Sequence, residues 1–433
     1  MMSHAALDRT LLLMRDDTRE DAPDHLLLDA LLGTRIALIA DPPNLATHSA
    51  QSAFIAAAMG FARQGATVHL IAPNSALIGS QPPLQRPNLI DALTEIDGKI
   101  IPRTSFVSTA AMGFFDVAVV LGDTAWTGSA ETAFRINADD WSGWLSEINS
   151  ATRWKGTDWP FGGLAAAALA AGEGYKAAMR KLRYWRRNDV FDEYFGSTAC
   201  ARVELVPAST PHVGNLGTFD FISGGAITHA TLFALARIPG VGGEIRIIED
   251  DTNNMSNANR YALLRLDRLH LLKATDLATQ GLGGLKVSPV TCRYEEMNLL
   301  QIGPLAPTVL VGVDHIPTRW EVQRASPSWL GIGATSHYST MFTAHQGHLP
   351  CAKCAHPIDD VGVGQIPTVS FVSLWAGLFL AARYVRIVAC GEENPDQQQI
   401  WFCPLRPEER PQLSPVPIHR KCICQHAVLG LPK

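Results

Sequence analysis

Short apolar runs alternate with helix-like segments along the first part of the chain. Residues 35–40 (RIALIA) and 66–71 (ATVHLI) are apolar, and an alanine-rich stretch at residues 49–64 lies between them. This order predicts a strand, a helix and a parallel strand, the unit from which α/β sheets are built. Residues 116–121 (DVAVVL) predict another buried strand, and residues 164–182 predict a long helix. The first part of the chain is therefore expected to form an α/β domain.

The same alternation starts again after a charged, aromatic stretch at residues 181–195 (KLRYWRRNDVFDEYF). The strands predicted there are residues 218–222, 244–248 and 308–313. We expect two similar α/β halves with a boundary near residue 190, giving domains 1–190 and 191–433. The chain contains no high-identity internal repeat, so the two halves would share architecture rather than sequence.

The composition is that of an ordinary globular protein. The 433 residues are 47% hydrophobic and 18% charged, with a net charge of -5 at pH 7. Because no block of lysine or arginine is present, this balance argues against a nucleic-acid-binding surface. The apolar run near the start of the chain is interrupted by Asp8 and Arg9, unlike a signal peptide or a membrane span. A cytoplasmic protein with no membrane partner is expected.

A small-residue turn follows the first predicted strand of the second half. It consists of Ser223, Gly224, Gly225 and Ala226. Small residues let a backbone approach phosphate groups, and the N-terminus of the following helix favours negative charge. Taken alone, these residues fit a turn without a ligand equally well, because tight turns between a strand and a helix recruit glycine.

Acidic and polar residues follow the next predicted strand. Glu249 and Asp251 stand where a ribose hydroxyl binds in nucleotide-binding sheets, and a dinucleotide-dependent enzyme would fit this much of the pattern. The chain then continues with the run SNANR, which contains Asn257 and Arg260, with Lys273, and with the segment VLVGVDHIPTR, which contains Asp314 and Arg319.

In this spacing the second half resembles the ubiquitin-activating enzymes and their relatives, the ThiF-type enzymes that adenylate sulfur-carrier proteins. The resemblance implies an α/β fold with two Rossmann-like adenylation-type domains, of which the second is active. One departure lies in the glycine-rich turn, since residues 223–228 read SGGAIT where the family has GxGGxG. A second departure is Glu249, which stands where the family usually has aspartate.

The resemblance implies a role for each of these residues. Arg260, Lys273 and a Mg²⁺ ion held by Asp314 would stabilise the charge that develops when a carboxylate attacks the α-phosphorus of ATP. Glu249 would bind the ribose, and Asn257 would position a phosphate or the metal. The ATP-binding set implied is Ser223, Gly224, Gly225, Ala226, Glu249, Asp251, Asn257, Arg260 and Lys273. Considered singly, the cations would be solvated side chains on helices and the aspartate a cap at a strand end.

An arginine of the first half belongs to the same expectation. The segment LDRTLLLMRDD resembles the family's helix before the first strand, whose arginine reaches the ATP site of the neighbouring domain. On this resemblance Arg9 would contact the γ-phosphate bound in the second half; the alternative is an exposed cation at the start of a helix. The first half is expected to be a degenerate copy, because Pro42 and Pro43 follow its first strand and lack the N–H donors of a phosphate loop.

Four of the eight cysteines form two close pairs. These are Cys351 with Cys354 and Cys422 with Cys424, a spacing typical of a tetrahedral Zn²⁺ site and similar to the family's structural zinc. A redox CxxC motif is the competing interpretation of the first pair. The family's thioester-forming cysteine is missing from the segment AHPIDDVGVGQIPTVSF after that pair. Either the enzyme stops at the adenylate, or one of Cys200, Cys292, Cys390 and Cys403 acts from another place.

A fused pair of one inactive and one active domain resembles the activating enzymes of bacterial ubiquitin-like conjugation operons (Bil-type), including those used against phage. The expected function is ATP-dependent adenylation of the C-terminal glycine carboxylate of a ubiquitin-like protein. Transfer to a conjugating enzyme and a homodimeric assembly are compatible with it. Two alternatives stay open: adenylation of a peptide C-terminus in peptide-antibiotic synthesis, and a non-catalytic nucleotide-binding interaction module.

Overall fold

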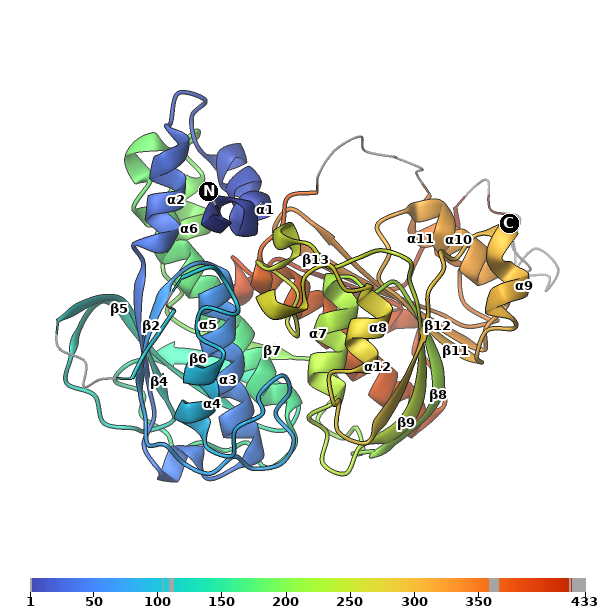
Figure 1. Cartoon of the computed structure of the whole chain (residues 1–433), viewed down its shortest axis with the longest axis horizontal. Coiled ribbons are helices and arrows are strands. Elements are labelled where there is room, and N and C mark those ends of the chain that lie inside the picture. Colours follow the sequence, from blue (N-terminus) through green and yellow to red (C-terminus); the bar gives the residue numbers. More distant parts are fainter. Residues whose placement is uncertain (1, 104, 109–112, 358–365, 420–421, 423–433) are drawn as a thin grey trace.

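The computed structural model describes the chain except residues 1, 104, 109–112, 358–365, 420–421 and 423–433. The protein forms two α/β halves that lie side by side, each organised around its own sheet (Figure 1). The fold class expected from the sequence, two Rossmann-like domains in one chain, is confirmed.

The first half is built on a seven-stranded sheet. In order across the sheet its strands are β3 (Phe106–Val107), β2 (Thr67–Ile71), β1 (Arg35–Ile39), β4 (Phe114–Leu121), β5 (Ser129–Ala138), β6 (Ser142–Glu147) and β7 (Ala201–Glu204). Strands β3 to β5 run parallel, and β6 and β7 extend the sheet in antiparallel pairing. The α-helices are α1 (Met2–Asp17), α2 (Asp24–Leu32), α3 (His48–Arg63), α4 (Leu89–Glu95), α5 (Phe161–Arg180) and α6 (Phe191–Phe195), with short 3-10 helices η1 (Pro43–Leu45) and η2 (Arg183–Trp185).

Continuous apolar runs form the central strands because both faces of the sheet are covered. Ile36 and Leu38 of β1 point into the main core, whereas Ala37 and Ile39 join a smaller cluster on the other face. On the main-core side the alanine-rich helices α3 and α5 pack against each other. Gly60 marks their close approach, since a Cβ atom there would lie 3.3 Å from the Cβ of the α5 alanine it faces.

The second half is built on an eight-stranded sheet. Its order is β10 (Leu285–Val290), β9 (Gly242–Ile248), β8 (Asn215–Ile222), β11 (Thr308–Val311), β12 (Trp329–Ser336), β13 (Ser339–His345), β14 (Gln399–Phe402) and β15 (Gln412–Ser414). The α-helices are α7 (Ala226–Leu235), α8 (Lys273–Ala278), α9 (Leu299–Ile302), α10 (Ile316–Arg324), α11 (Ala352–Ala355) and α12 (Ser370–Cys390). The 3-10 helices are η3 (Met255–Asn257), η4 (Leu266–Arg268), η5 (Glu296–Asn298), η6 (Pro395–Gln397) and η7 (Pro407–Glu409).

The two sheets share one strand order. In both, the first three strands are parallel and follow one another outward in one direction. The next strand of the chain crosses over and pairs with the other side of the first strand, and the antiparallel strands come after it. This crossing lies between β1 and β4 in the first half and between β8 and β11 in the second. In open α/β sheets, ligands bind outside the carboxyl ends of the strands at such a crossing. Each half therefore has one architecturally defined place for a ligand.

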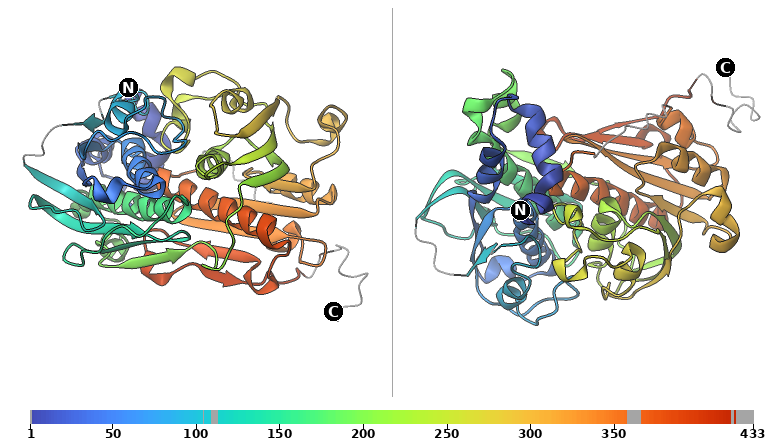
Figure 2. Two further views of the ribbon diagram at one scale, coloured as in Figure 1. Left: turned by 90° about the horizontal axis from the view of Figure 1, so that it is seen from below. Right: turned by 45° about the horizontal axis from the view of Figure 1, so that its top comes forward.

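Helix α12 joins the halves. Figure 2 shows it and α5 running through the middle of the molecule, and α12 packs on both α5 and α7. It is long and apolar enough to cross a membrane, but 89% of its most apolar window is buried inside the protein, as in a core helix. Gly377 permits the contact with α7, since a Cβ atom there would lie 2.3 Å from the Cβ of Ala230.

Each strand that the apolar runs predict is present, and its observed bounds differ from the prediction by at most three residues. The predicted boundary at residue 190 falls before β7, which pairs with β6 and so belongs to the first sheet. The chain enters the second sheet only at β8, so it passes from the first half to the second between residues 204 and 215. Sequence periodicity missed this because β7 is a four-residue edge strand, too short for a pattern.

Candidate functional site

A pocket of about 260 Å³ lies at the crossing in the second half, at the carboxyl ends of β8, β9 and β11. Segments from the whole length of the chain meet in it. The lining residues that the sequence predicts are Arg9, Ser223, Gly225, Ala226, Glu249, Arg260, Lys273 and Asp314. The lining residues that it missed include Tyr261, His315, Thr335, Thr368 and Ser373. Eight residues predicted from the sequence thus line one cavity.

The small-residue turn forms the floor between β8 and α7. Ser223 adopts a φ of 105°, and its Oγ accepts a hydrogen bond from the N–H of Gly225 at 3.0 Å. The N–H of Gly224 donates to Oε2 of Glu249 at 2.9 Å. A side chain at Gly224 would collide, because a Cβ atom there would lie 2.8 Å from the Cβ of Lys273. Glycine at this position therefore lets the turn, Glu249 and Lys273 come together.

Glu249 follows β9 and its carboxylate is oriented by main-chain donors. Besides Gly224, the N–H groups of Asp250 and Asp251 donate to its Oε1 at 3.1 Å each. The side chain is half-buried and lines the pocket. A carboxylate held this way keeps free lone pairs that can accept hydrogen bonds from hydroxyl groups.

Lys273 begins α8 and is buried beside two acidic residues. Its Nζ donates to Oδ2 of Asp251. Burial by itself lowers the pKa of this amine, but Tyr261, Glu249 and Asp251 outweigh it, and the net shift of the Lys273 pKa is upward. Asp251 is exposed and stands behind the lysine rather than among the lining residues. Its place in the structure is that of a partner for Lys273.

Arg260 is held by its own loop. Its Nη1 donates to Oδ1 of Asn259 at 2.9 Å and to the carbonyl of Ser256, and its guanidinium lies 5.4 Å from the centre of the Tyr261 ring. Burial lowers the pKa of Arg260, and the nearby charge of Arg9 lowers it further. None of the ion pairs in the described part of the chain includes Arg260. It therefore lines the pocket without an ion-pair partner among the described residues, and Asp314 and Asp8 are the carboxylates whose charges act on it from farther away.

Arg9 reaches the same pocket from α1. The helix packs against η3, and the main-chain oxygen of Arg9 accepts a hydrogen bond from the N–H of Thr368 at 3.3 Å. Its Nη1 donates to the carbonyl of Ile366 at 3.1 Å, while its buried Nε has no hydrogen-bond partner within the described residues. An arginine of the first half thus lines the pocket at the strand crossing of the second half.

Asp314 follows β11 and is exposed at the rim of the pocket. The residue before it is fixed, because Nε and Nη2 of Arg319 donate to the carbonyl of Val313 at 3.1 Å and 2.8 Å. Arg319 in turn lies 3.1 Å from Nδ1 of His356. The aspartate and arginine that the sequence paired thus form one loop, in which the arginine sets the backbone and the aspartate carboxylate is left available to a cation.

Asn257 lies outside the lining residues. Its Oδ1 accepts a hydrogen bond from the N–H of Asn254 at 2.9 Å, and the Asn254 side chain accepts one from the N–H of Asn257. The two residues close the turn that carries Arg260. The neighbouring Asn259, which the sequence reading passed over, bonds Thr10 of α1 at 2.9 Å and the carbonyl of Thr368 at 3.0 Å. Its position in the sequence between Asn257 and Arg260, both predicted site residues, could have marked it as part of the same loop.

The equivalent place in the first half is filled by a side chain. Nδ2 of Asn44 donates to Oδ1 of Asp41 at 2.8 Å and to Oδ1 of Asp123 at 2.7 Å. Its Oδ1 accepts from the N–H of Trp154 at 2.9 Å. A Cβ atom at Gly122 would lie 2.0 Å from that Oδ1, so the space is fully used. Prolines at residues 42 and 43 and the buried Asn44 leave no phosphate cradle there.

Three cysteines converge at the far side of the second half. The sulfur atoms of Cys351, Cys354 and Cys422 all lie within 4.8 Å of one another, with Cys351 Sγ 3.8 Å from Cys354 Sγ and 3.3 Å from Cys422 Sγ. Thiolates bound to one tetrahedral Zn²⁺ stand about 3.8 Å apart, given Zn–S bonds of about 2.3 Å. The donor set therefore fits such an ion. The fourth predicted ligand, Cys424, lies outside the described residues.

The other cysteines do not reach the pocket. Cys200 and Cys390 are exposed, Cys292 is buried and Cys403 is half-buried, and none of these four is among the lining residues. The geometry of the described residues thus selects no cysteine for a covalent step next to the candidate nucleotide site.

Comparison with known proteins finds a family model that matches part of the first half, a relative that aligns over part of the chain, and distant structural similarities. Over 133 residues the chain is 29% identical to the uncharacterized protein y4jF of Sinorhizobium fredii, an alignment that covers 30% of this chain and 25% of that protein. The aligned part thus spans about a quarter of this curated relative.

Among solved structures, E. coli MccB with succinimide superposes with a TM-score of 0.42 and 15% identity, over 60% of this chain and 84% of that chain. The microcin C7 biosynthetic enzyme MccB in complex with N-formylated MccA superposes with a TM-score of 0.41 and 13% identity, over 67% and 97%.

The family model of the BilD N-terminal domain matches residues 35–191. This range begins at the first residue of β1 and ends in α6, so it takes in the parallel strands of the first sheet and the helices that cover them. Residues 35–191 of the first half are therefore similar to the BilD N-terminal domain.

Proposed function

We propose that this protein binds ATP in the second-half pocket and adenylates the C-terminal carboxylate of a ubiquitin-like protein. The observation that carries the proposal is the convergence of Arg9, Arg260 and Lys273 on one cavity beside a small-residue turn at the strand crossing. Two of these cations have no carboxylate partner in the described part of the chain. A buried positive site of this kind is suited to a polyphosphate.

The residues divide the nucleotide between them. The turn at residues 223–226 and the N-terminus of α7 would receive phosphate oxygens, and the oriented carboxylate of Glu249 would accept hydrogen bonds from the ribose hydroxyls. Asp314 would hold Mg²⁺, which supplies charge neutralisation to the triphosphate. Arg9 would lie toward the end of the triphosphate that is farthest from Glu249.

The reaction needs stabilisation of charge rather than movement of protons. A carboxylate oxygen of the acceptor attacks the α-phosphorus, the bond from that phosphorus to the bridging oxygen of the β-phosphate breaks, and pyrophosphate leaves. Negative charge grows on the leaving group as this bond breaks. Arg260, Lys273 and Arg9 provide donors that are already in place before the reaction, which is the arrangement that lowers such a barrier.

The acceptor and the biological role are part of the proposal. Residues 35–191 match the model of the BilD N-terminal domain, and the second half resembles the ubiquitin-activating enzymes in the spacing of its polar residues. These two features together support a ubiquitin-like acceptor ending in glycine, delivery to a conjugating partner, and a role in defence against phage. Asn257 would place the phosphate indirectly, because it closes the turn that carries Arg260.

Exchange of labelled pyrophosphate into ATP, dependent on the ubiquitin-like protein, tests the proposal. Lys273→Ala and Asp314→Ala should each lower exchange by on the order of 10²-fold or more, the scale of one lost transition-state contact. Lys286→Ala is a matched control, because Lys286 is an exposed cation on β10 whose nearest partner is Glu244 at 3.8 Å. The control should exchange at the wild-type rate. Wild-type exchange in a folded Lys273 or Asp314 variant would remove that residue from the site.

A further inference from the structure

A second arginine of the first half contacts the loop that carries Arg260. Arg63 is the last residue of α3, and only 2% of it is exposed. Its guanidinium donates to three main-chain carbonyls of the second half: those of Ala258 at 2.7 Å, Ala262 at 3.0 Å and Leu264 at 2.7 Å. No described acidic side chain forms an ion pair with it.

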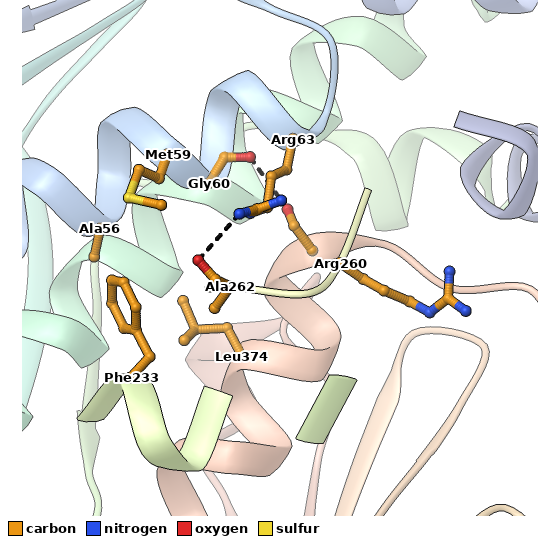
Figure 3. Close-up of a pocket in the computed structure, with 9 residues that line it drawn as sticks. Ala56, Met59, Gly60, Arg63, Phe233, Arg260, Ala262 and Leu374 are labelled. Atoms are coloured by element: carbon orange, nitrogen blue, oxygen red, sulfur yellow. Dashed lines mark hydrogen bonds between the residues drawn. The ribbon is translucent and has the colours of Figure 1, made fainter. Parts of the chain in front are cut away.

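The three carbonyls surround the part of the loop that faces the nucleotide site. Ala258 and Ala262 flank Arg260 and Tyr261 in the sequence, so Arg63 fixes the backbone on both sides of these two lining residues. Figure 3 shows Arg63 directed at the carbonyl of Ala262, while the side chain of Arg260 points away from it. Both arginines line a cavity of about 20 Å³ together with mostly apolar residues of α3, α7 and α12, and this cavity is too small to make a ligand site of its own.

We propose that Arg63, supplied by the half whose own site is filled, is a positioning residue for Arg260 in the nucleotide site of the other half. The inference rests on the proposed function, because Arg63 acts through the ATP-binding role of Arg260.

The chemistry of Arg63 favours this role over simple packing. A cation buried without a counter-ion is costly, and an apolar side chain of similar size usually stabilises such a position better. Burial lowers the pKa of Arg63 to about 9, which leaves the group charged near neutral pH. The planar fork of arginine donates from two separate Nη groups and so reaches carbonyls that stand apart, whereas the three donors of a lysine ammonium start from one atom. Arg63 is thus a charged residue whose burial is unfavourable and whose hydrogen bonds order the loop that carries Arg260.

The other side of the same loop is held from α1. Asn259, next to Arg260, donates to Oγ1 of Thr10 at 2.9 Å. The loop is therefore fixed by two helices of the first half, α1 through Thr10 and α3 through Arg63. With both contacts in place, the guanidinium of Arg260 has a defined direction before a nucleotide enters.

Two variants of Arg63 and one control test the inference by ATP calorimetry and pyrophosphate exchange. Arg63→Met removes the charge and the fork, and Arg63→Lys removes only the fork. Arg135→Met is the control, because Arg135 also donates to three carbonyls, those of Gly122, Thr124 and Ile148, but entirely inside the first half. We expect both Arg63 variants to weaken ATP binding and to lower exchange, by up to roughly 10²-fold for methionine, as for a displaced catalytic group. Arg135→Met should lose stability but not ATP affinity.

A double-mutant cycle separates positioning from a general structural role. If Arg63 acts through Arg260, Arg63→Met should cost little further exchange in an Arg260→Met background, because the group that it positions is already gone. Additive losses, or wild-type ATP binding and exchange in both Arg63 variants, would overturn the inference and leave the proposed function standing. Absence of ATP binding by the wild-type protein would instead overturn the proposed function, and this inference with it.

Discussion

Three cations face the pocket, and their surroundings differ. Lys273 is paired with Asp251, whereas Arg9 and Arg260 have no acidic partner among the residues that the structure describes. A bound triphosphate would offset the charge of the two arginines directly and would compete with Asp251 for the lysine. The ion pair therefore keeps Lys273 in position while no ligand is present, and this accounts for the second acidic residue of the motif.

A buried histidine beneath the same site should make the stability depend on pH. His229 of α7 is fully buried, and neither ring nitrogen has a hydrogen-bond partner within the described residues. Its ring lies 4.6 Å from that of Tyr261. Burial lowers the pKa of His229 well below its usual value, and the charges of Arg63 and Lys273 lower it further. The folded protein thus holds this imidazole neutral.

The sign of the effect follows from proton uptake. An unfolded histidine titrates near about pH 6.5, whereas the folded pKa of His229 is lower. Above about pH 6.5 the imidazole is neutral in both the folded and the unfolded protein, so its contribution to stability is complete there. Below that pH the unfolded protein takes up a proton that the folded protein does not, and the free energy of unfolding falls by at most about 1.4 kcal/mol per pH unit. His229→Leu should flatten the fall in the free energy of urea unfolding between about pH 6.5 and 5. His348→Gln, at an exposed position, is the control and should keep the wild-type slope.

At the scale of elements, the sequence predicts the strands whose own residues form a recognisable hydrophobic pattern. The central parallel strands were found because both of their faces are buried, which makes their sequences continuously apolar. Strands farther from the centre of each sheet were missed for the converse reason. β5, which pairs in parallel with β4, includes the buried Arg135, whose side chain donates to loop carbonyls, and β14 reads only QIWF. Their burial comes from neighbours that are distant in the chain.

The candidate site shows the same division. Ser223, Glu249 and Asp314 follow parallel strands, whose carboxyl ends must meet at one edge of the sheet, so their convergence could be predicted. Thr368 and the contacts of Arg63 could not be predicted, because they depend on how α12 and α3 pack across the interface between the halves.

A metal ion bound by the cysteine cluster should cross-link two segments of the second half. Cys351 precedes α11, Cys354 lies within it, and Cys422 lies beyond β15, so a shared ion would tie the segment after β15 to this helix. We expect about one Zn²⁺ per chain to be retained on purification, as measured by elemental analysis. Cys354→Ser should lower both the zinc content and the melting temperature, whereas Cys390→Ser, at an exposed position elsewhere, should change neither. A metal-free protein of full stability would contradict a structural zinc site.

At the scale of the whole molecule, the two halves keep one strand order but divide the work. The first sheet has the crossing at which a ligand would bind, yet Asn44 fills the space there. Its helices instead bring side chains to the second sheet: α1 supplies Arg9, and α3 supplies Arg63. The first half is thus a scaffold for the site of the second, in the way that one subunit of a dimer can complete the site of its partner.

Arg9 provides the most direct test of this division. Its guanidinium lines the pocket, and its Nε is buried without a partner among the described residues, so a phosphate oxygen would satisfy a group that is otherwise unpaired. Arg9→Ala should lower the rate of adenylation by on the order of 10²-fold or more, the scale of one lost transition-state donor. Lysine at this position should restore only part of the rate, because it lacks the planar fork.

The expected cost in stability is small, since the only side-chain hydrogen bond that Arg9 makes within the described residues is the one to the carbonyl of Ile366. Arg15→Ala is the matched control on the same helix, where the side chain pairs with Asp24 of α2 instead of facing the pocket. The control should lose some thermal stability and keep the wild-type rate. If Arg9→Ala adenylated as fast as the wild type, α1 would serve the second half only through its packing on η3 and the bond from Asn259 to Thr10. The first half would then act on the site only by holding the loop that carries Arg260, and Arg63 would be its main contribution.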